Sequence, residues 1–313
     1  MKFEKENVAK DLPPSPLKSV VLSIKFGKEN VAKGIFTLTA LISVLVILLI
    51  CGFLFGNGIP AIKEIGIKDF IFGTQWTPTN GKPSFGILPM ICGSFLVTLG
   101  AIVIGVPIGI LTSVFMSRFC PKKMYSFLKT ASDLMAGIPS VVYGFFGLVI
   151  LVPFVRLLRD NFGMDTNGCS ILTASILLGI MILPTIVGVS ESSIRAVTNT
   201  YYEGARALGA THERSVFRVI VPAAKSGIMA GVILGIGRAI GETMAVIMVA
   251  GNQARMPEGI LSGVRTMTAN IVIEMGYATG LHREALIATG LVLFVFILII
   301  NLCFSFLKRK GDN

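Results

Sequence analysis

The chain has 313 residues, of which 53% are hydrophobic and 14% are charged, whereas a soluble domain carries about 25% charged residues. Its separate apolar runs of about 20 residues are each long enough to cross a bilayer, which excludes an ordinary soluble protein. The formal net charge of +11 does not indicate nucleic-acid binding, because the basic residues lie at the ends of apolar runs rather than in one patch.

Taken in chain order, residues 1–33 form a polar N-terminal arm with seven lysines, and the first apolar run, 34–56, follows. This run exceeds the apolar core of a signal peptide, about 7–15 residues, so it predicts an uncleaved membrane helix. A more polar outer loop is expected over 57–87, and a short tail over 308–313. Between them, 88–307 form a core domain whose five apolar runs predict the spans 88–116, 134–155, 170–189, 227–250 and 285–306.

The distribution of lysine and arginine predicts the orientation of these spans. With the N-terminus inside, the inner segments hold 19 basic residues and the outer loops hold 8. Because inner loops carry the excess positive charge, we expect both termini in the cytoplasm. Lipid admits only helices or closed barrels, and these runs are too long and too continuously apolar for barrel strands. The predicted fold class is an all-α membrane protein with about six transmembrane helices.

Motifs of soluble enzymes are missing from the sequence. It has no GxxxxGK(S/T) phosphate loop, no HExxH motif and no GxSxG motif. The two histidines, His212 and His282, fall on opposite sides of the membrane in this topology, and the five cysteines share no metal-ligand spacing. We therefore expect no catalytic residue, no metal site and no cofactor on this chain. Energy for transport would come from a gradient or from another subunit.

The longest inner loop, 190–226, contains a recognisable spacing of residues. Residues 201–208 can form a short amphipathic helix that Gly209 ends, and Pro222 limits the helix that follows. A short exposed helix between two spans can fit a groove on another protein, although an ordinary surface helix is the plainer alternative. The residues that define the spacing are Glu203, Gly204, Ala205, Gly209 and Pro222.

This spacing resembles the loop signature EAA-x3-G-x9-I-x-L-P of ATP-binding-cassette importer permeases. Gly204 replaces an alanine of the signature, and two valines replace its Ile and Leu, so the departures conserve size or polarity. The resemblance implies that the loop docks on a separate ATPase subunit.

The fifth span contains two charges near its middle, Arg238 and Glu242. A central charge costs about 2.5–3.5 kcal/mol on insertion scales, and the i, i+4 spacing would let the two side chains pair on one helix face. A stripe of small residues on that face should meet protein or a water-filled path rather than lipid: Gly227, Gly231 and Gly235. The pair is either a structural lock or a polar element of an anion pathway, since the arginine fork suits oxyanions.

Pro139 and Ser140 lie in the third span, where proline removes a backbone hydrogen bond and is expected to kink the helix. The kink would either allow the helix to move during gating or only allow it to pack against its neighbours. The segments AGIPSVVYG at 136–144 and GRAIGETMAV at 237–246 together resemble the permeases of bacterial phosphate importers. FGILP at 85–89 and the Gly-Asn pair at 251–252 also fit. GETMAV followed by Gly-Asn is similar to the PstC class, whereas the companion PstA class usually reads GETAP.

The resemblance covers nearly the whole chain from residue 34 onward, and it implies the type I, MetI-like importer permease fold. It implies a heterodimer with a PstA-like permease, two PstB-like ATPase subunits that bind ATP and Mg, and a PstS-like phosphate-binding protein outside. It also implies a role in transport for Arg238 and Glu242. Three alternatives stay open: a permease for sulfate, molybdate or phosphonate, a gradient-driven secondary transporter, and a regulator that does not transport.

Overall fold

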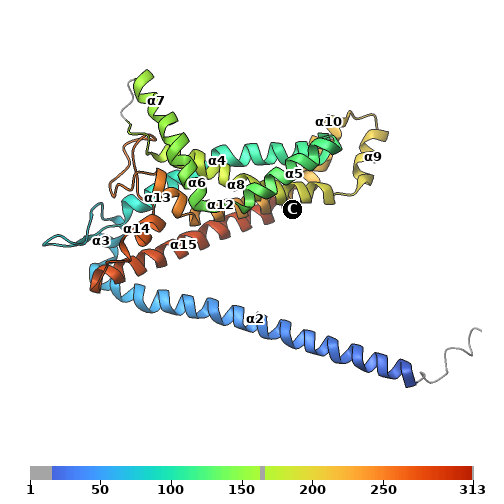
Figure 1. Ribbon diagram of the computed structural model, residues 1–313, viewed down its shortest axis with the longest axis horizontal. Helices are drawn as coiled ribbons and strands as arrows, with labels where there is room; N and C mark the ends of the chain where they lie inside the picture. Colours follow the sequence, from blue (N-terminus) through green and yellow to red (C-terminus); the bar gives the residue numbers. More distant parts are fainter. Residues whose placement is uncertain (1–15, 163–165, 312–313) are drawn as a thin grey trace, which may run out of the picture. The chain divides into compact units, whose positions relative to one another are not determined.

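The computed structural model describes residues 16–162 and 166–311, and Figure 1 labels most of their helices. The chain divides into two compact units, Met1–Phe55 and Gly56–Asn313. The predicted arm, 1–33, and the predicted tail, 308–313, therefore lie partly outside the described residues.

The first membrane helix, α2 (Pro16–Ile65), is longer than the sequence predicts. Its apolar part is a candidate span of 35 residues, Val31–Ile65, instead of 34–56. At 1.5 Å per residue this part is about 52 Å long, which exceeds a hydrocarbon core of about 30 Å. The helix therefore continues beyond the lipid tails, and the predicted outer loop is helical as far as Ile65.

The rest of the predicted outer loop is also folded. Helix α3 (Ile67–Phe72) leads into an antiparallel hairpin of β1 (Trp76–Thr77) and β2 (Ser84–Phe85), in which Trp76 lies opposite Phe85. These segments share a buried apolar cluster with the C-terminal part of the chain, including Met267 and Leu286. The hairpin is thus a packed element of the second unit.

The remaining helices of this unit follow in chain order and include three π-helical segments, labelled η. They are α4 (Leu88–Val114), η1 (Phe115–Phe119), α5 (Lys122–Gly137), α6 (Ser140–Phe146), η2 (Gly147–Leu151), α7 (Val152–Phe162), α8 (Ile171–Ala196), α9 (Asn199–Ala207), α10 (His212–Ser215), η3 (Val216–Ile220), α11 (Val221–Ala223), α12 (Lys225–Gly241), α13 (Met244–Val249), α14 (Met267–Glu274) and α15 (Gly280–Gly311).

Within the described residues, five helical segments are long and apolar enough to cross a membrane. A sixth candidate is broken: His212–Ala223 and α12 meet at a bend of 69°. The prediction of about six spans is confirmed, and the chain is a multi-pass membrane protein.

Helix α8 is the centre of the second unit, and it packs against both α4 and α12. In its most apolar stretch 67% of the residues are buried, against 28% in the most apolar stretch of Leu88–Phe119. The predicted glycine stripe of α12 faces α8, because side chains added at Gly227 and Gly231 would collide with serines of α8. The prediction that this stripe meets protein is therefore confirmed.

The third span differs from the sequence prediction. It runs over Ser140–Leu158 rather than 134–155, and α5 before it is a separate amphipathic helix in which no residue is buried. Pro139 has φ −60° and ψ 142°, and Ile138 is extended as well. The physical reason is that proline disfavours helical geometry in the residue before it. Pro139 therefore divides two helices instead of kinking one.

Candidate functional site

The charged part of the fifth span is a break between two helices. Helix α12 ends at Gly241, and Glu242 is extended, with φ −70° and ψ 131°. One carboxylate oxygen of Glu242 accepts hydrogen bonds from the backbone N–H groups of Thr243, at 3.1 Å, and Ala245, at 3.2 Å. These donors have no partner within a helix, so the carboxylate stabilises the start of α13.

This arrangement overturns the predicted ion pair. Arg238 lies in the last turn of α12, whereas Glu242 lies beyond its end, so the i, i+4 relation of a continuous helix is lost. Among the ion pairs of the described residues, none joins Arg238 to Glu242. The prediction of a pair on one helix face was wrong, because a carboxylate beside exposed N–H groups bonds to them locally.

The second helix break lies beside the first. Helix α6 packs against α13, and a side chain added at Gly144 would lie 2.6 Å from the sulfur of Met248. The hydroxyl of Tyr143 donates a hydrogen bond to the carbonyl of Met135, at 2.9 Å, which bridges the break at Pro139. The half-buried Arg238 is close enough to act on Tyr143 electrostatically. The structure thus places Glu242 at one break and Pro139 and Ser140 at the other, and the helices that follow these breaks, α13 and α6, pack together.

A buried polar network that the sequence analysis missed anchors this region. A carboxylate oxygen of Glu274 accepts from Arg265 at 2.6 Å. The other accepts from the indole of Trp76 at 2.8 Å and lies 2.8 Å from His282. The hydroxyl of Thr268 donates to the backbone carbonyl of Glu242 at 3.2 Å, so α14 also holds the broken segment. The one available signal was an acid inside the apolar run 267–275.

The loop residues lie on an exposed helix. Glu203, Gly204 and Ala205 belong to α9, in which no residue is buried, and Leu208 after it is 91% exposed. Gly209 has φ +84° and donates to the carbonyl of Arg206 at 3.0 Å, a glycine-dependent helix end. Pro222 lies in α11, just before the bend into α12. The predicted short helix and its end at Gly209 are confirmed, although the helix begins at Asn199, two residues before the predicted start.

Comparison with known proteins identifies the family. Residues 105–311 match the model described as "Binding-protein-dependent transport system inner membrane component". The chain belongs to this family. It is a transmembrane permease subunit, a transport component rather than an enzyme.

Two relatives cover most of this permease. The "probable ABC transporter permease protein YqgH" of Bacillus subtilis is 38% identical over 284 residues, which are 88% of this chain and 90% of the relative. The "phosphate transport system permease protein PstC" of Mesorhizobium japonicum is 34% identical over 289 residues, 86% of this chain and 88% of the relative.

Solved structures have the same fold at lower identity. A bacterial alginate ABC transporter matches with a TM-score of 0.60 and 17% identity, covering 90% of this permease and 96% of that chain. The MetNI methionine transporter matches with a TM-score of 0.52 and 19% identity, covering 72% and 94%. The predicted MetI-like permease fold is therefore confirmed.

Proposed function

We propose that this permease forms half of the translocation path of an ATP-driven phosphate importer, and that a second, PstA-like permease forms the other half. The observation that carries the proposal is the similarity to PstC phosphate permeases from several organisms, at 33–34% identity over 82–89% of the chain. Alternatives for other oxyanions share the fold, so the substrate must be tested directly.

The two adjoining helix breaks support a position for the path. Interrupted helices are tolerated at membrane depth where they are buried in protein or line a water-filled cavity, and transporters often bind their substrates there. In this proposal Arg238 attracts the phosphate, because its planar fork matches two oxygens of an oxyanion. Glu242 fixes the break by holding the first N–H groups of α13.

In this proposal the segment at Pro139 and Ser140 is a hinge between α5 and α6. The extended residues at 138–139 separate α5 from α6, so a few dihedral angles can change the angle between these helices. A change of that angle would alter access to Arg238, because Tyr143 of α6 lies within the electrostatic reach of its side chain.

The partners follow from the same proposal. The exposed helix α9, with Glu203, Gly204 and Ala205 and the terminating Gly209, docks on a PstB-like ATPase that binds ATP and Mg, while Pro222 sets the start of α12. A PstS-like binding protein delivers phosphate on the opposite side. Both chain ends then lie in the cytoplasm, as the excess of basic residues on that side favours.

The test is reconstitution of the permease with its partner permease, the ATPase and the binding protein in lipid vesicles. Phosphate-loaded binding protein should stimulate both ATP hydrolysis and phosphate uptake. Stimulation by sulfate but not by phosphate would identify another oxyanion as the substrate. Uptake that continues without the ATPase would identify a secondary transporter, and wild-type uptake in a strain that lacks this permease would favour a regulator.

The docking role of α9 has its own test in the variant Glu203→Lys. We expect the ATPase to copurify less well with this variant, because the charge of an exposed α9 residue is reversed, while membrane insertion stays normal. The control is Arg206→Gln on the same helix, which removes a charge instead of reversing one and should therefore reduce ATPase copurification less. Normal copurification of the ATPase with Glu203→Lys would contradict the docking assignment.

A further inference from the structure

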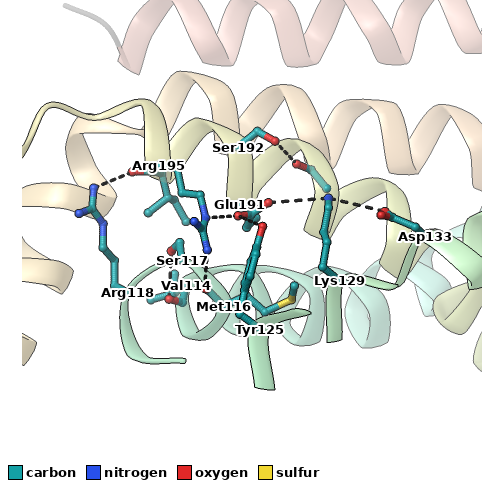
Figure 2. Close-up of polar contacts among 12 residues, drawn as sticks. Val114, Met116, Ser117, Arg118, Tyr125, Lys129, Asp133, Glu191, Ser192 and Arg195 are labelled. Atoms are coloured by element: carbon teal, nitrogen blue, oxygen red, sulfur yellow. Dashed lines mark hydrogen bonds and ion pairs between the residues drawn. The ribbon is translucent and has the colours of Figure 1, made fainter. Parts of the chain in front are cut away.

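A polar cluster around the buried Glu191 attaches α5 to the end of α8 (Figure 2). Glu191 of α8 is 4% exposed, and it forms an ion pair with Arg195, one turn further along. From α5, the hydroxyl of Tyr125 donates to Glu191 at 3.1 Å, and the ammonium of Lys129 lies 3.8 Å from its other oxygen. The guanidinium of Arg195 stacks on the ring of Tyr125, 4.0 Å from its centre. Three side chains therefore converge on one carboxylate.

A second set of contacts connects this end of α8 with the start of α9. Arg118 of η1 donates to the backbone carbonyls of Ile194, at 2.9 Å, and Val197, at 3.3 Å. Its other terminal nitrogen donates to the side chain of Asn199, the first residue of α9, at 3.3 Å (Figure 2 shows Arg118 beside this cluster). The start of α9 is thus tied to the same turn of α8 that holds Arg195.

The contacts continue from α5 to the helix breaks. Met135, near the end of α5, accepts the hydrogen bond from Tyr143 across the break at Pro139. Tyr143 in turn lies within the electrostatic reach of Arg238. Side-chain contacts therefore link α9, the end of α8, α5 and α6 in one continuous series.

Glu191 is the buried polar group of α8 to which Tyr125 and Lys129 of α5 attach. No residue of α5 is fully buried, and only one partly buried face, which includes Leu128 and Met135, meets the neighbouring helices. A cavity of about 160 Å³ lies between α5, α4 and α8, and its lining includes Thr112, Met116, Leu128, Met135 and Pro184. This cavity is partly open, so α5 is not tightly enclosed on that side.

We propose that Glu191 is a positioning residue that couples α9 to α5, so that movement of the docked ATPase reaches the break at Pro139. A displaced α9 moves Arg118 and the last turn of α8, and Glu191 passes this displacement to Tyr125 and Lys129. This inference rests on the proposed function, because it requires α9 to be the ATPase-docking helix.

The first test follows α5 with two spin labels in the complete complex. The five native cysteines are replaced by serine, and the labels are attached to Ser126→Cys on α5 and Val103→Cys on α4. In the wild-type background, ATP with vanadate should change the label-to-label distance. In Glu191→Gln this change should be lost, and in Glu191→Asp it should be largely retained. An unchanged response in Glu191→Gln, or loss of the ATPase from that complex, would overturn the proposal.

The second test compares substrate uptake with ATP hydrolysis in vesicles. Glu191→Gln should lower the uptake per ATP hydrolysed by about tenfold, within the usual range of a lost coupling interaction. The matched control is Asp133→Asn, which removes a carboxylate that is 64% exposed and pairs with the same Lys129 at 3.6 Å. The control should keep the wild-type ratio. Equal losses of uptake and hydrolysis in Glu191→Gln would indicate a merely structural role.

The two tests separate this inference from the proposed function. If phosphate is not the substrate, the wild-type complex itself takes up no phosphate, whereas the label distances depend on ATP alone. If phosphate is the substrate and Glu191 does not couple, wild-type uptake is normal and the labels respond equally in both backgrounds.

Discussion

Glu191 and Glu274 are the buried acids of the described residues, and their surroundings differ. Glu274 is enclosed by Trp76, Arg265 and His282 at 2.6–2.8 Å, and the side chains of the last two are 16% and 10% exposed. The cationic partners of Glu191 are more open, with Lys129 34% and Arg195 44% exposed. Water screens and competes for such contacts. We therefore expect the contacts of Glu274 with Trp76, Arg265 and His282 to be rigid, and we call this region the anchor. We expect the contacts of Glu191 with Tyr125, Lys129 and Arg195 to be adjustable, and we call this region the joint.

The largest effect is expected at Arg238, which belongs to neither region. Arg238→Gln should abolish phosphate uptake while the complex still assembles, because the variant keeps polarity and approximate size but removes the charge that attracts the anion. Uptake by reconstituted vesicles and copurification of the ATPase are the two measurements. Near-normal uptake would show that the arginine serves structure only.

The anchor is tested by Glu274→Gln. We expect a destabilisation of about 3–5 kcal/mol, because removal of one charge leaves Arg265 without its buried counter-charge. The midpoint of thermal unfolding of the purified complex measures this change. Glu191→Gln should lower the midpoint clearly less, since its partners already reach water. If the two variants were equally unstable, the distinction between anchor and joint would be wrong.

A smaller loss of stability is expected when the hydrogen bond between the hairpin and Glu274 is removed. Trp76→Phe removes the indole donor to Glu274 and should cost about 1.5–3 kcal/mol, the range for hydrogen bonds to charged groups. Tyr125→Phe is the matched change at Glu191, and we expect its cost to be smaller. Both are measured by thermal unfolding, and a larger loss in Tyr125→Phe would reverse the comparison.

The smallest expected effect concerns the end of α9. Gly209→Ala places a side chain at φ +84° and should cost about 1–2 kcal/mol locally. This strain should weaken copurification of the ATPase and leave the thermal stability of the hairpin region unchanged. A matched control is Gly204→Ala, inside α9, where an added side chain meets open space. If Gly209→Ala and Gly204→Ala retained the ATPase equally well, the left-handed turn at Gly209 would not matter for docking.

Sequence patterns predicted the number of spans and the loop helix, because both depend on near neighbours, but they did not predict the bounds of the first and third spans. Apolar length identified the membrane segments, and the Glu203-to-Gly209 spacing identified α9 and its end. Sequence patterns failed where a side chain bonds to nearby backbone groups instead of to the partner that the pattern predicts. The break at Glu242 depends on a carboxylate that bonds to N–H groups beyond the helix end, and the i, i+4 rule does not consider that alternative.

The sequence by itself determined that this chain is an all-α membrane permease, because hydropathy, span length and motif spacing are properties of consecutive residues. Only the tertiary structure decided which polar residues meet. Tyr125 lies 66 positions from Glu191, and Trp76 lies 198 positions from Glu274. A buried carboxylate is stable only when it has hydrogen-bonding or charged partners. For Glu191 and Glu274 these partners are brought close by the packing of the helices and not by their spacing along the chain.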